Sequence, residues 1–584
     1  MRRLFAYMKA YKKESVLGPL FKMLEASFEL FVPLVVARMV DVGIVQRDSG
    51  YILKMGGILV LLALIGLACS LTAQYFAAKA ATGAATALRG DLFSHIGSLS
   101  YGELDRVGAS TLITRMTNDI NQVQTGINMT LRLLLRSPFV VFGAMIMAFT
   151  VDIRSAMIFA VTIPVLCLIV FGIMALTMPL YKKVQKQLDR VLSAVRENLL
   201  GVRVIRAFNR QESERIRFEG ENDQLVRQQV FVGKLSALLN PFTYIAVNMA
   251  IVAVLWTGAG QVDAGNLSQG KVIALVNYMS QILGELVKMA NLIVIISKSV
   301  ACMNRVDQVF LVESTIKERK EIPEAAKREK DTSVPKVEMR QAGFTYAQAK
   351  EPSLKGISFQ AMAGQTIGII GGTGSGKTSL VNLIPRFYDV SEGSVLVDGK
   401  DVRDYPISGL REKISIAPQK SVLFKGTLKE NMLWGREDAS DEEIYAALEI
   451  AQAREFVEAK GEGLSLFIDQ EGRNLSGGQR QRLAVARALV RRPEILILDD
   501  SASALDFATD ARMRKAIREN TEGITVFLVS QRAASLKGAD QILVLDEGRL
   551  VGAGSHRELL RTCQVYREIC LSQLSKEEVE RDEQ

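Results

Sequence analysis

Residues 473–506 read RNLSGGQRQRLAVARALVRRPEILILDDSASALD. The segment opens with a small glycine-rich turn and continues as a helical run with arginines on its polar face. An apolar strand, residues 495–498, then ends on Asp499 and Asp500. Ligands bind at the carboxyl edge of parallel sheets, and an acid at that edge can help to hold Mg²⁺. The stretch therefore predicts an α/β domain that handles nucleotides.

A second glycine-rich stretch lies upstream, directly after a predicted strand over residues 366–370. Its residues are Gly371, Gly372, Thr373, Gly374, Ser375, Gly376, Lys377, Thr378 and Ser379. Glycines let backbone N–H groups approach and cradle phosphate, and the N-terminus of the following helix adds its positive end. Lys377 is placed to reach the β- and γ-phosphates of ATP, and the Thr378 hydroxyl is placed to ligate Mg²⁺.

The composition indicates an apolar half joined to a soluble half. The chain has 584 residues, too many for one domain, and 48% of them are hydrophobic although 23% are charged. The net charge of +9 reflects lysines and arginines at the ends of apolar spans and in nucleotide-handling segments. No basic patch interleaved with aromatic residues indicates nucleic-acid binding, and the five cysteines form no CxxC pair.

A spanning helix needs about 20 mainly apolar residues. Six segments qualify, at about 16–40, 55–79, 133–152, 155–178, 241–260 and 272–297. Short connectors join them in pairs, whereas residues 80–132 and 179–240 are long, polar and helical in pattern. Basic residues cluster before the first span, so the positive-inside rule places both termini in the cytoplasm of a plasma (inner) membrane.

These boundaries predict four parts. They are a transmembrane domain over residues 1–311, a charged linker over 312–335, a nucleotide-binding domain over 336–575 and a charged tail over 576–584. Each long cytoplasmic extension should carry a short helix that docks on a nucleotide-binding domain. The candidates are Glu103–Asp119 and Gly201–Glu212, with Glu103, Arg106, Arg115 and Asp119 as candidate contacts.

Charged residues occur inside two of the spans, where they cost several kcal/mol unless they face protein or a cavity. Lys22, Glu25 and Glu29 share one face of the first span, and Glu285 and Lys288 lie in the sixth. Two interpretations stay open for both sets, a polar patch lining a transport cavity or a structural ion pair.

The glycine-rich turn, the P-loop and the strand ending in Asp499, in this arrangement, resemble the ATP-binding cassette (ABC) superfamily. With six spans ahead of them, the chain looks like a half-transporter of the exporter type. The resemblance implies an α-helical transmembrane domain with long cytoplasmic extensions, followed by an α/β P-loop domain that binds ATP and Mg²⁺. It also implies a dimer, because in this family the signature turn of one subunit completes the P-loop site of the other.

The resemblance assigns roles residue by residue. Tyr346 would stack on adenine, Gln419 would contact Mg²⁺ or the attacking water, Asp499 would hold Mg²⁺, and Asp506 would lie in the loop that crosses to the partner. The signature turn that would contact the partner's nucleotide consists of Leu475, Ser476, Gly477, Gly478 and Gln479.

Two positions depart from the family pattern. Asp500 stands where glutamate is usual, and Gln531 stands where a histidine is usual. A carboxylate set back by one methylene is poorly placed to polarise water, and glutamine cannot carry a proton as histidine does. The chain is thus similar to the degenerate-site subunit of a bacterial heterodimeric multidrug-type transporter, one that binds ATP at its own P-loop and hydrolyses it slowly.

The leading functional hypothesis is ATP-driven export of an amphipathic compound, drug or lipid. Three alternatives remain at this stage: a homodimeric exporter, an importer of siderophores or metal chelates built on the exporter fold, and a non-transporting ATP-gated regulatory subunit.

Overall fold

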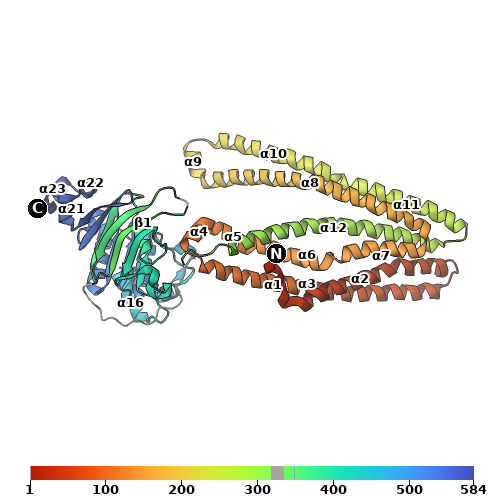
Figure 1. Ribbon diagram of the computed structural model, residues 1–584, viewed down its shortest axis with the longest axis horizontal. Coiled ribbons are helices and arrows are strands. Elements are labelled where there is room, and N and C mark those ends of the chain that lie inside the picture. Colours follow the sequence, from red (N-terminus) through yellow and green to blue (C-terminus); the bar gives the residue numbers. More distant parts are fainter. Residues whose placement is uncertain (1, 317–333, 348, 522, 584) are drawn as a thin grey trace. The chain divides into compact units, whose positions relative to one another are not determined.

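The computed structural model describes residues 2–316, 334–347, 349–521 and 523–583. Most of the predicted linker therefore lies outside the described residues. The chain forms two compact units (Figure 1). The first comprises residues 1–97 and 110–312, and the second comprises residues 98–109 and 313–584.

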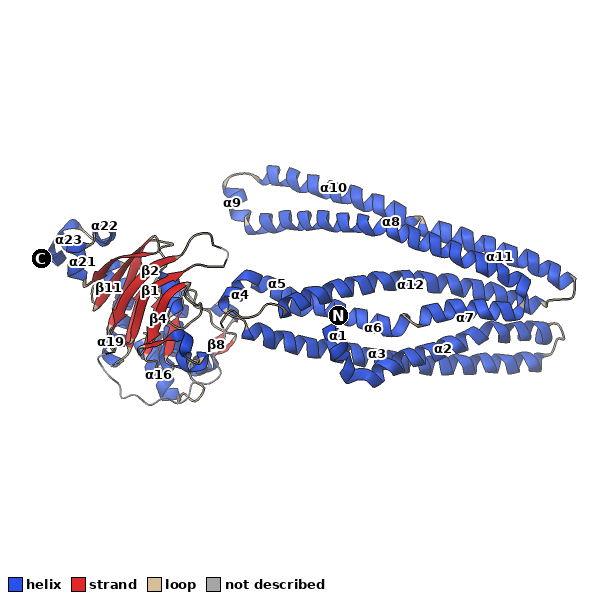
Figure 2. Ribbon diagram, viewed as in Figure 1, coloured by secondary structure: helices blue, strands red, loops and turns tan. Residues whose placement is uncertain are grey.

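In the part of the chain that the structure describes, the first unit is helical throughout (Figure 2). Its α-helices are α1 (Arg2–Met8), α2 (Lys12–Arg38), α3 (Ser49–Ser98), α5 (Ala109–Thr114), α6 (Ile120–Leu133), α7 (Arg136–Val151), α8 (Ile153–Leu200), α9 (Val202–Ala207), α10 (Gln211–Ala237), α11 (Leu239–Asp263) and α12 (Gln269–Phe310). A 3₁₀ turn precedes α2, and π-helical turns follow α2 (Met39–Ile44) and α5 (Arg115–Asp119).

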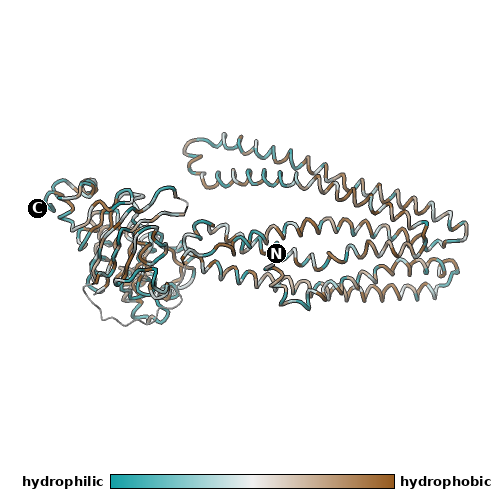
Figure 3. The backbone as a smooth tube through the Cα atoms, in the orientation of Figure 1, coloured by the Kyte–Doolittle hydropathy of each residue, from teal (hydrophilic) through white to brown (hydrophobic). Residues whose placement is uncertain are grey.

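Among the described residues, five helical stretches are long and apolar enough to cross a membrane: 49–98, 109–151, 153–200, 211–263 and 269–310. They contain the second to sixth predicted spans. The predicted first span lies in α2 and the turn after it, and its crossing of the membrane stays a prediction because α2 carries Lys22, Glu25 and Glu29. Figure 3 shows the change along α8 and α10, which are hydrophilic near α9 and hydrophobic toward α11.

Short connections at one end of the unit hold these helices in pairs. Asp152 alone separates α7 from α8, and its side chain accepts a hydrogen bond from the Ser155 backbone N–H at 2.8 Å. A side chain at this position satisfies an otherwise unpaired donor of the first helical turn. The short connector predicted between the third and fourth spans is therefore built as a tight, capped turn.

The second unit is built on a six-stranded sheet with the order β12-β11-β3-β10-β9-β6. All neighbours in it are parallel except β11 and β12. Its strands are β3 (Thr366–Gly371), β6 (Ile414–Ala417), β9 (Ile495–Asp499), β10 (Thr525–Val529), β11 (Gln541–Asp546) and β12 (Arg549–Gly554). Strands β9 and β10 are buried at every position, as expected for parallel strands covered on both faces.

A second, antiparallel sheet has the order β2-β1-β4-β5, from β1 (Val337–Phe344), β2 (Leu354–Ala361), β4 (Glu392–Val397) and β5 (Lys400–Asp401). The short strands β7 (Gly426–Thr427) and β8 (Phe467–Ile468) pair with each other. The helices of this unit include α4 (Tyr101–Val107), α13 (Lys377–Leu383), α14 (Ile407–Glu412), α15 (Leu428–Leu433), α16 (Asp441–Ile450), α17 (Arg454–Ala459), α18 (Gly477–Val490), α19 (Phe507–Asn520), α20 (Ala533–Leu536), α21 (His556–Thr562), α22 (Gln564–Gln573) and α23 (Lys576–Glu583).

The predicted charged tail is helix α23, which packs into the second unit. Val579 is only 1% exposed, and the Asp582 carboxylate pairs with Lys537 and lies 3.4 Å from His556 Nε2. His556 also contacts the Tyr566 hydroxyl at 2.7 Å, and burial lowers the pKa of its imidazole. The C-terminal segment thus contributes to the fold around a structural histidine.

Candidate functional site: a nucleotide site at one edge of the sheet

The sheet order brings the predicted motifs together. Strands β3, β10, β9 and β6 are neighbours and parallel, so the segments after their carboxyl ends meet at one edge. The P-loop follows β3, Gln531 follows β10, Asp500 follows β9 and Gln419 follows β6. Motifs far apart in sequence thereby form one site.

The P-loop backbone adopts the conformation that its glycines allow. Gly374 has φ +82° and Gly376 has φ +96°, a region that favours glycine. A Cβ on Gly376 would lie 2.7 Å from the Ser353 carbonyl oxygen, whereas one on Gly374 would meet no atom within 4 Å. The loop is therefore closely packed on one side and open on the other, as a phosphate cradle requires.

Lys377 lies buried within this loop. Its ammonium donates hydrogen bonds to the carbonyl oxygens of Gly371 at 2.9 Å and Gly372 at 2.7 Å. Burial lowers the pKa of Lys377, while the carboxylates of Asp499 and Asp500 act in the opposite direction. A buried ammonium held mainly by carbonyl oxygens fits a site whose charge balance is completed by phosphate oxygens.

Thr378 and Asp499 supply a fitting pair of Mg²⁺ ligands. The Thr378 Oγ1 donates to Asp499 Oδ1 at 3.1 Å, so a hydroxyl and a carboxylate lie side by side beneath the loop. Hard oxygen donors of this kind suit Mg²⁺, which usually binds through one or two such groups together with substrate phosphates. Burial raises the pKa of Asp499, and a bound cation would favour its ionised form.

Asp500 projects from a strained point directly after β9. Its φ is +47°, which asparagine and aspartate tolerate best, and its backbone N–H donates to the Val529 carbonyl oxygen at 3.1 Å. Burial raises the pKa of Asp500, while Lys377, Arg532 and a hydrogen bond from Gln419 oppose the shift. The structure thus brings the predicted residues Asp500 and Gln419 into contact.

Gln531 is exposed at the same edge. Its backbone carbonyl oxygen accepts a hydrogen bond from Gln573 Nε2 at 2.8 Å, which fixes the chain after β10 against α22. The neighbouring Ser530 hydroxyl accepts from the Arg532 N–H at 3.0 Å. The backbone at position 531 is therefore well supported.

Tyr346 lies next to the P-loop helix. Its hydroxyl and that of Ser379 are 2.9 Å apart, and its ring packs edge-on against Phe344 and Tyr388. The ring is only partly buried. This position agrees with the predicted role as a platform for the base, which stays a prediction.

The signature turn forms a capped helix N-terminus. The Ser476 hydroxyl accepts from the Gln479 N–H at 3.2 Å, and the Gln479 side chain accepts from the Ser476 N–H at 2.9 Å. Leu475 is buried beneath the turn, whereas Ser476 is exposed and Gly477 and Gly478 are half-buried. The turn therefore presents backbone donors and a hydroxyl outward, away from its own core.

The same turn packs on the loop that follows Asp500. A Cβ on Gly478 would lie 3.0 Å from the Ala504 carbonyl oxygen, so only glycine fits without displacement. Gln481 joins the two segments: its side chain donates to Ser503 Oγ and accepts from the Ala504 N–H, both at 2.9 Å. No sequence motif marked Gln481, and only the spatial neighbourhood reveals its role.

Asp506 has a local partner that its motif does not predict. Its carboxylate accepts from the Thr509 N–H at 2.9 Å and caps α19. The predicted contact of Asp506 with a partner subunit stays a prediction.

Helix α4, within the predicted docking segment, belongs to the same compact unit as the nucleotide-binding residues. Tyr101 packs on Phe387 with ring centroids 4.5 Å apart, and the Tyr388 hydroxyl donates to the Asp105 carboxylate at 2.7 Å. Burial, followed by this hydrogen bond, raises the pKa of Tyr388. Since Tyr388 also touches Tyr346, a continuous set of rings joins α4 to the nucleotide site.

Two of the predicted docking residues have partners within this chain, and their contact with a nucleotide-binding domain stays a prediction. Glu103 is buried and accepts from the backbone N–H groups of Ser100 and Thr315, so it stabilises its own helix. Asp119 is 4% exposed and pairs with Arg305 and Arg115 inside the first unit. Glu103 binds its own helix cap and the distant Thr315, and Asp119 pairs with the distant Arg305. The distant partners are not predictable from a local sequence pattern.

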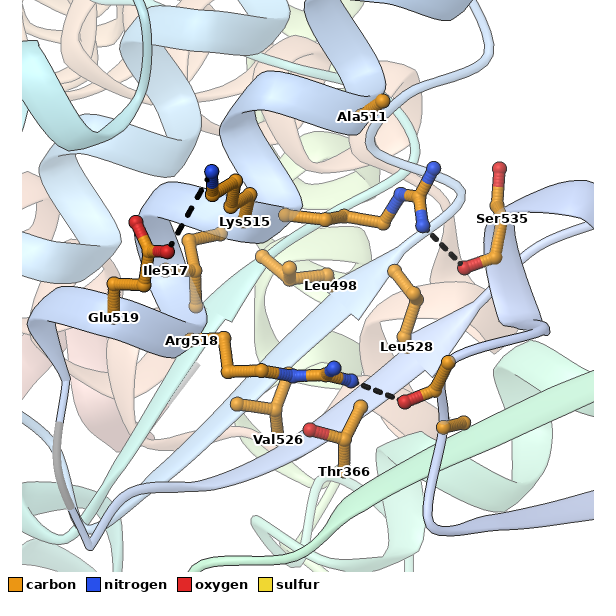
Figure 4. Close-up of a pocket in the computed structure, with 13 residues that line it drawn as sticks. Thr366, Leu498, Ala511, Lys515, Ile517, Arg518, Glu519, Val526, Leu528 and Ser535 are labelled. Carbon is orange, nitrogen blue, oxygen red and sulfur yellow. Dashed lines mark hydrogen bonds and ion pairs between the residues drawn. The ribbon is translucent and has the colours of Figure 1, made fainter. Parts of the chain in front are cut away.

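The second unit also contains a cavity of about 390 Å³ away from these motifs (Figure 4). It lies between α19 and the sheet, where Arg514 donates to the Ser535 carbonyl oxygen at 2.9 Å and Arg518 donates to that of Gly538. Arg514 also pairs with the buried Asp510. These arginines are engaged in holding α19 and α20 and do not extend the nucleotide site.

A P-loop site with a separate, outward-facing signature turn, on a chain with a helical unit able to cross a membrane, defines an ATP-dependent membrane transporter. The comparisons agree. Residues 15–286 match the family model of the ABC transporter transmembrane region, and residues 354–503 match the family model described as ABC transporter. The chain belongs to the ABC transporter family, as an exporter half-transporter that couples ATP hydrolysis to transport.

Relatives span nearly the whole chain. The uncharacterised ABC transporter ATP-binding protein YfiB of Bacillus subtilis is 35% identical over 577 residues, 99% of both chains. The ATP-dependent lipid A-core flippase of Hahella chejuensis is 30% identical over 97% of this chain and 95% of its own. The solved structure of a bacterial Atm1-family ABC exporter with ATP bound has the same fold, with a TM-score of 0.77 at 23% identity, covering 97% of this chain and 99% of that one.

Proposed function

We propose that this chain is one half of a heterodimeric exporter of amphipathic compounds, and that its own P-loop side binds ATP with Mg²⁺ but hydrolyses it slowly. The observation that carries the proposal is Asp500. It occupies the position directly after β9 from which a carboxylate would polarise the attacking water, and its side chain is one methylene shorter than glutamate.

The surroundings of Asp500 support slow hydrolysis. Its backbone is tied to Val529 and its carboxylate to Gln419, so the group cannot shift outward without losing these contacts. A misplacement of about 1 Å can cost on the order of a hundredfold in rate. Gln531 adds to the effect, because an amide can donate to a phosphate oxygen but cannot take up or carry a proton.

The signature turn supports a second, competent site. The capping box of the turn is complete, and Ser476 lies exposed at the N-terminus of α18. Two nucleotide-binding domains that pair head to tail would place this turn over the P-loop of the partner. A partner that supplies glutamate and histidine at the two departed positions would then hydrolyse ATP against an intact signature turn.

Two observations support the proposed substrate class: the chain has a membrane-spanning unit, and one relative is a lipid flippase. A lipid A-core flippase matches nearly the whole chain, which favours a lipid or another amphipathic compound drawn from the inner leaflet. The proposed orientation is that of the charge pattern, with both termini and the nucleotide-binding domain in the cytoplasm. The domain limits proposed are 1–311, 312–335, 336–575 and 576–584.

The test is ATP hydrolysis by the purified full-length chain, alone and mixed with a homologous half-transporter that carries glutamate and histidine at the two positions. The proposal predicts that the chain alone hydrolyses ATP slowly, at most a few-fold faster than the Lys377→Ala control. It predicts a large rise in the rate of hydrolysis when the partner is added. Robust hydrolysis by the chain alone would overturn it in favour of a homodimer. If the chain belongs to an importer, oriented vesicles should show ATP-dependent transport of the substrate in the direction opposite to export. If it is a regulatory subunit, the reconstituted pair should transport nothing.

A further inference from the structure

Four charged side chains on three packed helices of the first unit form a chain of alternating sign. Arg136 of α7 pairs with Glu29 of α2 at 2.6 Å and with Glu285 of α12 at 2.5 Å. Lys288 pairs with the same Glu285 oxygen at 2.8 Å. In order, the members are Glu29, Arg136, Glu285 and Lys288, and their charges sum to zero.

The middle of this ion chain is buried and its ends are not. The side chains of Arg136 and Glu285 are 7% and 4% exposed, whereas those of Glu29 and Lys288 are 43% and 52% exposed. The Ser137 hydroxyl donates to the second Glu285 oxygen at 2.9 Å. The centre is therefore fixed by hydrogen bonds, while an anionic end and a cationic end remain accessible to a ligand.

The buried centre retains unused hydrogen-bonding capacity. Arg136 Nε is buried, and none of the described residues accepts a hydrogen bond from it. Gln281 Oε1, one helical turn from Glu285 on α12, is likewise buried without a donor among the described residues. Unmet polar groups of this kind are costly in an apolar surrounding, so the region is better suited to polar contents than to lipid chains.

The exposed face of α12 around Lys288 is polar. Residues three or four positions apart make up this face, and they are Asn277, Ser280, Gly284, Lys288 and Asn291. Exposed side chains elsewhere in the predicted spans include large apolar ones, for example Leu64 and Leu71 of α3 and Trp256 of α11. A polar face on a membrane-spanning helix is expected to line an aqueous cavity or to meet protein.

The depth of the ion chain can be estimated from helix lengths. At about 1.5 Å per residue, Arg136 lies about 22 Å from the far end of α7, and Glu285 lies about 24 Å from the start of α12. With these two helix ends at the outer border of a hydrocarbon core of about 30 Å, the ion chain lies in the inner half of the core. In the orientation proposed above, that half belongs to the inner leaflet, from which the headgroup of a lipid can reach the site.

We propose that Glu29 and Lys288 bind the headgroup of a zwitterionic amphiphile, with its ammonium on Glu29 and its phosphate on Lys288. A neutral headgroup with two opposite charges matches both ends and leaves the region neutral. A purely cationic or anionic ligand would leave one end without a counter-charge and add a net charge where the dielectric constant is low. The inference rests on the proposed function in one respect, since it names the substrate class of the same exporter.

The test is equilibrium binding to the full-length chain in an uncharged detergent, measured by displacement of radiolabelled lysophosphatidylethanolamine. The competitors are lysophosphatidylglycerol and an alkyltrimethylammonium of the same chain length. The wild-type chain should prefer lysophosphatidylethanolamine to both by about tenfold. Glu29→Gln should remove the preference over lysophosphatidylglycerol, and Lys288→Gln should remove the preference over the alkylammonium.

The matched control is Lys298→Gln, an exposed lysine farther along α12 that should leave all three affinities unchanged. Thermal unfolding and ATP binding verify that each variant is folded. Equal binding of the three probes by the wild-type chain, or variants that bind as the wild type does, would overturn the proposal, and tighter binding of either singly charged probe would do so as well. Because this readout needs no hydrolysis, a failure of the heterodimer proposal would leave it interpretable.

Discussion

Replacing Asp500 with glutamate should accelerate hydrolysis at the chain's own P-loop site. The added methylene moves the carboxylate outward by more than an ångström, and a displacement of about 1 Å is worth up to about a hundredfold in rate. A hundredfold corresponds to about 2.7 kcal/mol of transition-state stabilisation. The contact with Gln419 restrains the aspartate in its present position, so the gain requires the longer side chain.

The structure also predicts a small loss of stability. Residue 500 has φ +47°, which a glutamate adopts at a cost of about 1 kcal/mol relative to the preferred region. Hydrolysis should therefore be measured well below the unfolding temperature, as single-turnover release of phosphate by the purified chain. Adding Gln531→His should increase the rate further, because an imidazole can carry a proton that an amide cannot.

The matched control is Asp499→Glu, the same chemical change one residue earlier. Asp499 is 4% exposed and already contacts Thr378 at 3.1 Å, so a longer side chain there should weaken Mg²⁺-dependent ATP binding without accelerating hydrolysis. If Asp500→Glu and the double variant hydrolyse no faster than the wild type, the explanation based on a recessed carboxylate is wrong.

Two further predictions concern other parts of the second unit. Tyr388→Phe removes the hydroxyl that donates to Asp105, a contact worth about 1 kcal/mol, and should reduce substrate-stimulated hydrolysis several-fold while ATP affinity stays constant. In the control Tyr405→Phe, which loses a hydrogen bond inside the domain, substrate-stimulated hydrolysis should not fall at constant ATP affinity. Equal behaviour of the two variants would contradict a role of Tyr388 in coupling. Burial lowers the pKa of the His556 imidazole in the folded state. The stability that neutral His556 contributes is therefore fully present above the unfolded-state pKa of about 6.5, and it is lost as the pH falls from there through the pKa of the folded state. Thermal unfolding from pH 7.5 to about 5.5 should therefore show a steeper loss of stability for the wild type than for His556→Gln, and parallel curves would refute it.

The sequence indicates where the nucleotide-binding motifs lie because each motif is local. A few neighbouring residues determine the backbone conformation of each motif: the glycines of the P-loop, the acids after β9 and the signature turn. Their convergence followed from a general property of parallel sheets, which the strand order β3-β10-β9-β6 confirms.

Contacts between distant residues could not be predicted in this way. Glu29 and Glu285 both meet Arg136, which no periodicity of α2 or α12 reveals. The burial of Asp119 against Arg305 likewise depends on helices that pack only in the folded unit. The interpretation of the charges in the spans therefore stayed open until the packing of α2, α7 and α12 was known.

The most direct test of the central claim compares two variants in the assembled transporter with its partner subunit. If this chain supplies a working signature turn and an impaired hydrolytic side, Ser476→Arg should nearly abolish ATP turnover, because it blocks the turn that serves the partner's P-loop. Asp500→Asn should slow turnover by less than about threefold, since little hydrolysis occurs at its own site. The opposite ranking, with Asp500→Asn as damaging as Ser476→Arg, would contradict the account.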